Sequence, residues 1–575
     1  MAQSKPLLVV AIDMGTTYSG YAFSFQHEFL ADKLKITTNK VWQDGYNQLH
    51  TSYKTPTSVL IDPEWQFHSF GYEAEAKYSE LARASKQKQW LLFRRFKMTL
   101  YTRKISESME LESLSGQRFN ALSVFAMSIR YLKEHLSQSL PQQVADSEIQ
   151  YVITVPAIWD EDAKQFMRKA AVQAGISPQR LTLALEPEAA SVLFRVLSSR
   201  NSYEFNGADI SEPGSRYIVV DAGGGTVDTT VHEVMTSGKL KELHKASGGD
   251  WGGTQVDDQF TELLLEIFTI KVMKEFGKTH QSDWLELEKE FEINKRKVSG
   301  NDLQVSSFRL PASLREAFSL YNTCSLEQHV SNSRFAGLVR FIGDKMRING
   351  KVMQDLMKPT IQKIVSHVET LMADPKCSGI SHILLVGGFS DSPFLQEIFR
   401  KNFPTVMVVT PLDAVLSVMK GAVIFGHHPG VVCVRLAKCT YGMRYWPFFN
   451  DAVHDKDKMH IVDGQRYCRD VFKTFIAEGE EVPCYKESSE EIFTPVYSDQ
   501  KTMSLPVYMS TERAPKYITD HSCRQLGKFT VTLPTLIGRS ARDVGVRFVF
   551  GETSLRVKAE EKATGNITEA TFGFQ

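Results

Sequence analysis

The stretch Val9–Tyr18, with the sequence VVAIDMGTTY, decides the fold of this 575-residue chain. Its apolar first half is typical of a buried strand, and the strand runs into Asp13, Gly15 and two threonines. Gly15 lets the chain turn tightly and brings backbone N–H groups close to a ligand. The threonine hydroxyls can donate to phosphate oxygens, and Asp13 can hold Mg²⁺ through water, because Mg²⁺ gives up its water shell reluctantly. Taken alone, the stretch is as typical of a hairpin turn in an ordinary sheet.

A second copy of the pattern makes the phosphate interpretation the stronger one. Tyr217–Asp228, with the sequence YIVVDAGGGTVD, repeats the apolar strand, the acid, the glycines and the threonine. Two such loops far apart in one chain predict a duplicated domain with one phosphate site between its halves. A third glycine-rich strand end follows at Ile383–Ser390, ILLVGGFS.

These three motifs together resemble the ATPase superfamily of actin, hexokinase and Hsp70. The sequence AIDMGTTYS at 11–19 is similar in particular to the first phosphate loop of Hsp70 proteins. The resemblance implies that ATP or ADP binds with Mg²⁺ between two ribonuclease H-like lobes, with Asp13 and Asp221 as the metal-binding residues. It implies phosphate contacts from both loops: Gly15, Thr16, Thr17, Tyr18, Gly223, Gly224, Gly225 and Thr226.

The composition excludes several other classes of protein. The chain is 42% apolar and 23% charged with a formal net charge of zero, so bulk electrostatics gives no argument for nucleic acid. Its longest apolar runs are too short to span a membrane, and the run at the N-terminus lacks the cleavage pattern of a signal peptide. The seven cysteines have neither CxxC nor metal-ligand spacing, which favours a reducing compartment, the cytosol or the nucleus.

Two further segments supply candidates for catalysis. Hsp70 proteins carry a lysine near the segment FRRFKM at 93–98 that reaches the γ-phosphate and the attacking water. Lys97 is the candidate here; Arg94 and Arg95 remain alternatives, as does a solvated basic helix face. Glu186, in LEPEAA at 185–190, resembles the glutamate that faces the magnesium site and positions water, although a glutamate before proline can also merely cap a helix. The resemblance implies a catalytic set of Glu186, Asp221, Thr226 and Lys97. Glu188 departs from the threonine usual in the family, which leaves the local hydrogen bonding open.

Three segments resemble the adenosine-binding parts of Hsp70. In GGDWGGTQVD at 248–257, Gly252 and Gly253 precede a helix whose N-terminus would favour an anion, or they form an ordinary glycine turn. The sequence EINKRKVS at 292–299 resembles the purine-binding strap, which sugar kinases lack. The resemblance assigns the purine and ribose to Glu292, Lys295, Arg296 and Ser299, followed by Gly387 and Gly388.

Asp391 stands where Hsp70 proteins have an arginine that stacks on adenine. A carboxylate cannot replace a guanidinium in this role. We therefore expect adenine binding to be weaker or altered, with Asp391 next to the base.

Beyond residue 428 the helical periodicity stops, and short β-branched and aromatic runs alternate with turns, which predicts an antiparallel β-sandwich. The predicted fold class is α/β: duplicated actin- and Hsp70-like lobes followed by a C-terminal β-sandwich. We expect a nucleotide-binding domain at 1–428 and a substrate-binding-like domain at 429–575. Within the first, lobe I covers about 1–200, lobe II about 215–395, and the chain returns to lobe I at about 396–428.

Several features are similar to the divergent heat shock 70 kDa protein 12 group of the Hsp70 family. They are the long inserts, Asp391 and the expected absence of a helical lid, because the sequence given ends at Gln575. The function implied is ATP binding with slow Mg-dependent hydrolysis, coupled to protein or peptide clients of the β domain, with nucleotide-exchange or co-chaperone partners. The alternatives are a nucleotide-gated signalling scaffold with little turnover and, less favoured, a small-molecule kinase. Whether the protein is an enzyme is left open.

Overall fold

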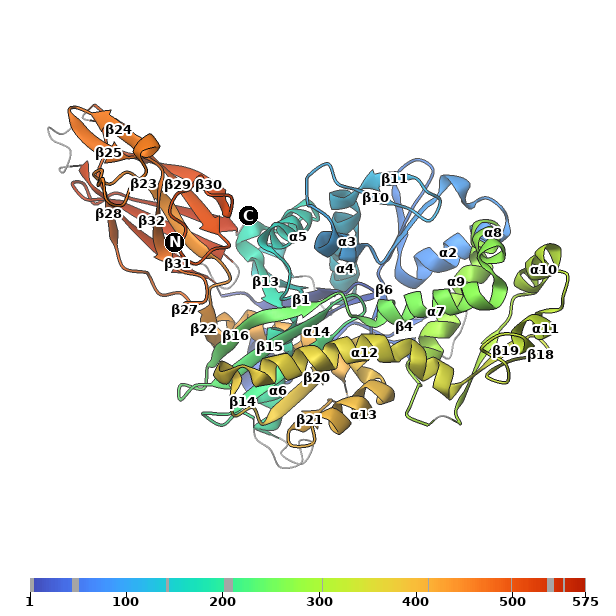
Figure 1. Cartoon of the computed structure of the whole chain (residues 1–575). Helices are drawn as coiled ribbons and strands as arrows, with labels where there is room; N and C mark the ends of the chain where they lie inside the picture. The colour runs from blue at the N-terminus through green and yellow to red at the C-terminus, as the bar shows by residue number, and fades with distance from the viewer. Residues whose placement is uncertain are drawn as a thin grey trace. The chain divides into compact units, whose positions relative to one another are not determined.

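The computed structural model describes residues 5–43, 51–140, 144–200, 210–301, 303–411, 413–497, 499–534, 542–551 and 554–573 (Figure 1). The chain divides into two compact units. Unit 1 comprises Met1–Trp159, Phe166–Val231 and Ala246–His428, and unit 2 comprises Asp160–Gln165, His232–Lys245 and Pro429–Gln575. Among the described residues, no helix has the length and apolarity needed to cross a membrane.

The first sheet of unit 1 is built around β1 (Leu8–Met14), whose seven residues are all buried. β1 pairs in parallel with β12 (Ile149–Val155) and antiparallel with β2 (Tyr18–Phe25). The strand order is β13-β12-β1-β2-β3, where β13 is Leu181–Leu185 and β3 is Thr37–Thr38. A strand inside a sheet that is covered on both faces must be apolar along its whole length, which explains the run that precedes Asp13.

A second sheet, five of whose strands belong to unit 1 apart from their residues within His232–Lys245, is built in the same way around β14 (Arg216–Ala222), which pairs in parallel with β20 (His382–Val386). Its order is β21-β20-β14-β15-β16, with β21 at Met407–Val409, β15 at Val227–Val234 and β16 at Leu240–Gly249. In each sheet the loop-bearing strand has two strands on one side and the next strand in sequence on the other. Asp13 and Asp221 therefore occupy equivalent ends of equivalent strands.

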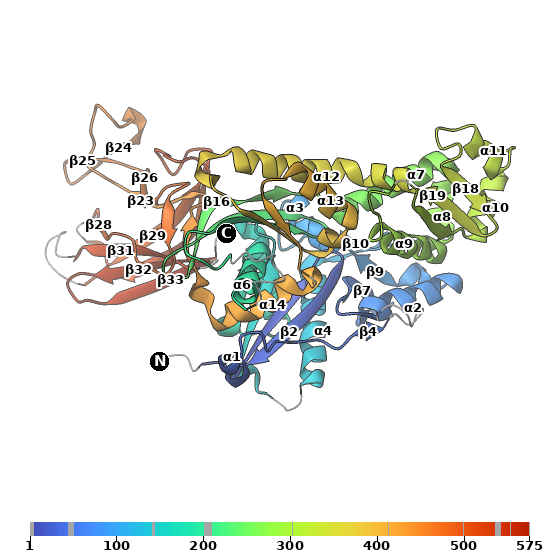
Figure 2. The same cartoon turned by 90° about the horizontal axis from the view of Figure 1, so that it is seen from below.

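Helices and small sheets surround these two sheets. α14 (Ala414–His427) packs on β1, β12 and α6 (Glu186–Ser198). In both views, α8, α10 and α11 gather with β18 and β19 at one end of unit 1 (Figures 1 and 2). The remaining helices are α1 (Gln26–Ala31), α2 (Gly71–Arg83), α3 (Thr99–Thr102), α4 (Ala121–Ser139), α5 (Glu161–Gln173), α7 (Gly253–Phe268), α8 (Ile270–Thr279), α9 (Gln281–Lys295), α10 (Ala312–Tyr321), α11 (Leu326–Ser331), α12 (Gly350–Ala373) and α13 (Pro393–Asn402). The remaining strands are β4 (Trp42–Gln43), β5 (Thr51–Ser52), β6 (Thr55–Pro56), β7 (Ser58–Ile61), β8 (Phe67–Phe70), β9 (Leu91–Arg94), β10 (Glu110–Glu112), β11 (Arg118–Asn120), β17 (Val305–Arg309), β18 (Val339–Ile342) and β19 (Lys345–Asn349).

Local signals in the sequence account for the start of α5 and for much of α12. The N–H of Ala163 donates to Asp160 Oδ1 at 2.9 Å, as expected of a residue that caps α5. The segment 341–372 is largely helical, since α12 covers Gly350–Ala373, while the residues before Gly350 belong to the hairpin of β18 and β19. The polar linker expected at 197–215 falls partly on residues 201–209, which lie outside the described residues.

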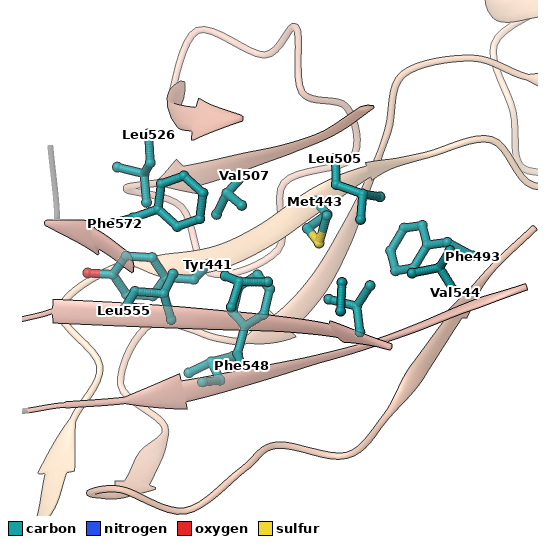
Figure 3. Packing of buried hydrophobic residues seen from close by; sticks show 14 of the residues in the cluster. Tyr441, Met443, Phe493, Leu505, Val507, Leu526, Val544, Phe548, Leu555 and Phe572 are labelled. Carbon is teal, nitrogen blue, oxygen red and sulfur yellow. The ribbon is translucent and has the colours of Figure 1, made fainter. Parts of the chain in front are cut away.

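Unit 2 contains two four-stranded sheets that share one apolar core. Their orders are β26-β23-β29-β30 and β28-β31-β32-β33. Side chains of both sheets point toward one another (Figure 3), among them Met443, Leu505, Phe548 and Leu555. The strands are β23 (Thr440–Tyr445), β26 (Val471–Ile476), β28 (Glu491–Phe493), β29 (Thr502–Ser510), β30 (Cys523–Thr532), β31 (Val544–Phe550), β32 (Ser554–Glu561) and β33 (Ile567–Gly573).

The rest of unit 2 is also made of strands. β22 (Val432–Leu436) lies between the start of β16 and β27 (Glu481–Pro483), parallel to the first and antiparallel to the second. β24 (Met459–Val462) and β25 (Gln465–Cys468) form a hairpin. The described residues after 428 form strands and short 3₁₀ turns, and no α-helix.

Candidate functional site

A cavity in unit 1 brings together residues from nine separate segments of the chain. It lies among the β1–β2 loop, the β14–β15 loop, the start of α7, the end of α9 and the turn after β20, and its empty space is about 1020 Å³. The predicted residues that line it are Asp13, Gly15, Thr16, Thr17, Tyr18, Lys97, Glu186, Asp221, Gly223, Gly224, Gly225, Thr226, Gly253, Glu292, Lys295, Arg296, Gly387 and Gly388. Gly252, Ser299 and Asp391 are not among the lining residues.

The two glycine loops have the same backbone turn. The N–H of Gly15 donates to the carbonyl of Tyr18 at 3.1 Å, and the N–H of Gly223 donates to that of Thr226 at 3.0 Å. The loops also approach each other closely, since a Cβ on Gly224 would collide with the side chain of Thr17. The glycines thus allow the two loops to face each other across one small space.

The start of α7 braces the second loop. The N–H groups of Gly252, Gly253 and Thr254 donate to the carbonyls of Gly225, Gly223 and Gly224 at 3.1, 3.0 and 2.8 Å. The sequence predicts either an anion site at this helix N-terminus or a glycine turn, and these three N–H groups bond the loop. The contribution of Gly252 is therefore to hold the loop in shape.

Asp13 is a buried carboxylate held in its charged form. Its Oδ1 accepts from Thr154 Oγ1 at 2.7 Å, and its Oδ2 pairs with Lys54 Nζ at 2.6 Å. Burial opposes the charge of Asp13, but the nearby Lys54 and Lys97 outweigh it and hold the pKa below its usual value. A carboxylate that stays ionised while buried is a suitable partner for a hydrated cation.

Glu186 and Asp221 are buried acids with the opposite shift. Burial raises the pKa of Glu186 to about 7, with Asp13 and Asp228 adding to the rise and Lys97 opposing it. Burial raises the pKa of Asp221 well above its usual range, and Glu186, Asp228 and Asp13 add to the rise. These carboxylates repel one another, and a divalent cation would relieve the repulsion.

The oxygen ligands available suit Mg²⁺ in particular. Within the described part of the chain, no group of three or more His, Cys, Asp or Glu residues is placed to hold a metal by itself. Mg²⁺ usually keeps several waters and takes one or two carboxylates plus phosphate oxygens. Asp13 and Asp221, on facing loops, fit that pattern.

Lys97 is the basic residue of its segment that lines the cavity. Its Nζ lies 2.7 Å from Glu186 Oε1 and 5.3 Å from the ring centre of Trp159. Only 2% of Lys97 is exposed, so a solvated helix face is the wrong interpretation for this residue. The two alternatives are engaged elsewhere, Arg94 with Glu75 and Arg95 with Asp257.

The residues at the end of α9 are fixed by ion pairs. Lys295 Nζ lies 2.6 Å from Asp257 Oδ1 and 2.6 Å from Glu292 Oε2, and Glu292 Oε1 lies 2.8 Å from Arg296. The Arg296 guanidinium also lies 5.2 Å from the ring centre of Tyr18. The strap is therefore arranged around the cavity by its own charges.

Two residues of the adenosine prediction lie outside this arrangement. Ser299 bonds Gln304 Oε1 through both its N–H and its hydroxyl, each at 3.1 Å. Asp391 is half-buried beyond the cavity wall; burial raises the pKa of its carboxyl, although Arg296 and Lys54 oppose the rise. Both residues remain near the strap without forming the wall of the cavity.

Several lining residues were missed from the sequence. They are Ser52, Lys54, Phe389, Ser392, Val415 and Val418. Lys54 lies in a polar insert that has no motif, and only its position beside Asp13 identifies it. The two valines follow the helical spacing of α14, which could have indicated a shared face.

Comparison with known proteins agrees with this geometry. The model of the family described as Hsp70 protein matches residues 95–428. Heat shock 70 kDa protein 12A of Homo sapiens is 33% identical over 628 aligned residues, which cover 100% of this chain and 92% of the relative. Heat shock 70 kDa protein 12B of Homo sapiens is 33% identical over 636, with the same shares. Chaperone protein DnaK of Metamycoplasma hominis is 24% identical over 57% of this chain and 49% of the relative.

The chain therefore belongs to the Hsp70 family. Its similarity over the full length to heat shock 70 kDa proteins 12A and 12B confirms the divergent group that the sequence predicted.

Proposed function

We propose that the protein binds ATP and ADP with Mg²⁺ in the unit 1 cavity and hydrolyses ATP slowly. The single observation that carries this proposal is the cavity itself, which gathers both glycine loops, three buried acids and the α9 strap. Membership of the Hsp70 family supports the same ligand.

In this proposal the two loops hold the phosphates, and Asp13 and Asp221 hold hydrated Mg²⁺. The metal would neutralise phosphate charge when bound. Glu186 orients the attacking water, and Lys97, fixed by its ion pair with Glu186, stabilises charge on the γ-phosphate. Thr226 donates its hydroxyl to a phosphate oxygen. Catalysis is then positioning and charge stabilisation, as in other phosphoryl transfers.

We also propose that unit 1 consists of duplicated lobes and that unit 2 contains a substrate-binding β-sandwich. The matching turns at Gly15 and Gly223 and the matching strand orders support the duplication. The shared core of the two four-stranded sheets supports the sandwich. The proposed boundary between the domains stays at 428/429, with protein or peptide clients in unit 2. The packing of α14 on β1 and β12 supports the return of the chain to lobe I that we predict at about 396–428.

Calorimetric titrations with ATP, in the presence and absence of Mg²⁺, and a single-turnover hydrolysis assay test this proposal. We expect calorimetry to show ATP binding that tightens with Mg²⁺, and single-turnover assays to show hydrolysis. Glu186→Gln should keep the dissociation constant within a few-fold and lower the rate by roughly two orders of magnitude or more, the usual worth of a positioned acid–base group. Wild-type binding without any hydrolysis would favour the second candidate.

The second candidate is a nucleotide-gated scaffold with little turnover. Asp391 favours it, because its carboxylate lies near Arg296 and supplies no cation to stack on the base. In that case ATP would change the conformation of unit 1 while unit 2 holds a protein partner.

A further inference from the structure

Two cysteines of unit 2 lie directly opposite each other on neighbouring strands. The pairing of β22 with β27 sets Val434 against Pro483 and Arg435 against Val482. Continued by one residue, the same register sets Cys433 against Cys484. The N–H of Cys484 donates to the carbonyl of Cys433 at 2.9 Å, which confirms this register.

The Cα spacing of such a pair lies in the range of disulfides, while the Cβ atoms of opposite residues, about 4.5–5.5 Å apart, must approach to about 3.5–4.5 Å. Opposite residues that share this hydrogen bond in an antiparallel pair have Cα atoms about 5.5 Å apart, close to the commonest separation in disulfides, about 5.5–6 Å. Their side chains leave the sheet on the same face, since directly opposite residues always do. Both residues are thiols in this structure, and both are partly exposed.

The surroundings allow the small movement that a bond requires. β27 is a three-residue strand at the edge of its sheet, where it pairs with β22 on one side. The Sγ of Cys433 now donates to the carbonyl of Leu240 on β16 at 3.4 Å. A turn about χ1 moves a cysteine sulfur from one staggered position to another, so Cys433 can exchange this contact for Cys484.

We propose that Cys433 and Cys484 form a reversible disulfide that ties β22 to β27. With glutathione disulfide as oxidant, one cysteine thiolate attacks a glutathione sulfur and expels a glutathione thiolate. The second thiolate then attacks the mixed disulfide and expels the other glutathione. Two protein thiols are oxidised, one glutathione disulfide is reduced to two glutathiones, and the two thiol protons pass to the leaving thiolates.

Burial makes four of the other cysteines less reactive than an ordinary thiol. Burial raises the pKa of the thiols of Cys439, Cys468 and Cys523, which lowers their thiolate fraction. Burial also raises the pKa of Cys377, to about 11. Cys324 is exposed and serves as the matched control for simple accessibility.

Oxidation has a local structural consequence. A disulfide sulfur carries no hydrogen, so the bond between Cys433 and Leu240 is lost while β22 becomes covalently fixed to β27. The bond also closes the segment 433–484, which includes β23, the β24–β25 hairpin and β26. β22 should therefore separate from β27 less often in the oxidised chain.

The test uses the full chain incubated with glutathione disulfide under native conditions. Peptide mapping should find one linkage, between Cys433 and Cys484, that dithiothreitol reverses. Cys433→Ser and Cys484→Ser should each leave the remaining cysteine with a glutathione adduct, and Cys324→Ser should behave as the wild type. Amide exchange in 432–436 and 481–484 should slow on oxidation of the wild type and not of Cys484→Ser.

Three results would overturn the proposal. They are a wild-type map in which Cys433 and Cys484 each keep a glutathione adduct, a map in which they pair with other cysteines, and a linked chain whose amide exchange is unchanged. The wild-type map needs no variant, so it decides the linkage even if a serine variant does not fold.

Discussion

Asp13 and Asp221 are the residues on which the metal proposal depends. If they hold hydrated Mg²⁺, Asp13→Asn or Asp221→Asn removes a charge that interacts with the metal and little that touches ATP alone. We expect the dissociation constant of Mg-ATP to rise about tenfold or more, since bonds to charged groups are worth about 1.5–3 kcal/mol. Calorimetry with Mg²⁺ and with a chelator compares the two forms. Asp391→Asn, outside the cavity wall, is the control, and equal losses with and without Mg²⁺ would contradict the assignment.

The raised pKa of Glu186 predicts that the free energy of unfolding depends on pH, which can be measured without nucleotide. Its pKa of about 7 in the folded chain lies above the ordinary 4.5, so the folded state binds the proton more tightly than the unfolded state. Its contribution to the free energy of unfolding is full below about pH 4.5 and is lost as the pH rises toward 7. Glu186→Gln cannot lose a proton. Relative to the wild type, the variant should therefore gain about 1–3 kcal/mol between pH 5 and 8.

Denaturant unfolding at a series of pH values, without Mg²⁺ or ATP, measures this difference. Lys97 faces the same carboxylate at 2.7 Å, and its charge is left without this partner in the variant. A constant difference between the two proteins across the range would mean that Glu186 is already ionised at pH 5.

At the scale of elements, the turn after β20 sets the position of Asp221. Gly387 has φ +86°, and a Cβ there would collide with Asp221 Oδ1 and the carbonyl of Ala222. A side chain in this backbone region costs about 1–2 kcal/mol, and the collision displaces the acid of the second loop. Gly387→Ala should therefore lower stability and weaken Mg-ATP binding at least about tenfold.

Gly388→Ala is the matched control for the stability part of this prediction, because Gly388 itself lines the cavity. No atom lies within 4 Å of the Cβ that it would add, and its φ is ordinary. Both variants are compared by thermal unfolding and by calorimetric titration with Mg-ATP. If Gly388→Ala lowers stability and Mg-ATP affinity as much as Gly387→Ala does, the effect comes from any side chain added to this turn and not from the displacement of Asp221.

The elements around the cavity were largely predictable because their signals are local. The apolar run before Asp13 and its copy before Asp221 each read as a strand, and each became one, β1 and β14. Lys54 was not predictable, since its role comes from a salt bridge to Asp13 that only folding creates. The bonds of Gly252, Gly253 and Thr254 to the loop were missed for the same reason. Whether their N–H groups bond an anion or a carbonyl depends on what lies opposite.

At the scale of the whole molecule, the pattern beyond residue 428 predicted strands but not how they pair. β22, β23, β31 and β32 coincide with short runs of β-branched and aromatic residues. Which strands join the same sheet depends on contacts between residues distant in sequence. One example is the pairing of β22 with β16 across some 190 residues. Period-two patterns carry no information about partners of that kind.

Each unit has its own buried core, so we expect two unfolding transitions that respond to different changes. Phe548 is fully buried in unit 2 and stacks on Phe475 with ring centres 4.1 Å apart. Phe548→Ala should remove about 3–5 kcal/mol from the unit that contains it and lower only that transition. Mg-ATP should raise the midpoint temperature of the other transition, that of unit 1. The increase should grow with the logarithm of the Mg-ATP concentration.

Scanning calorimetry of the wild type and Phe548→Ala, each with and without Mg-ATP, separates the two effects. Ile492, which is 44% exposed on β28 of the same unit, gives the control Ile492→Ala, for which we expect a small change because little of its contact is lost. The result that decides is which of the two transitions has a higher midpoint temperature when Mg-ATP is present. If it is the one that Phe548→Ala lowers, either the two units unfold together or the nucleotide binds outside the cavity between the glycine loops.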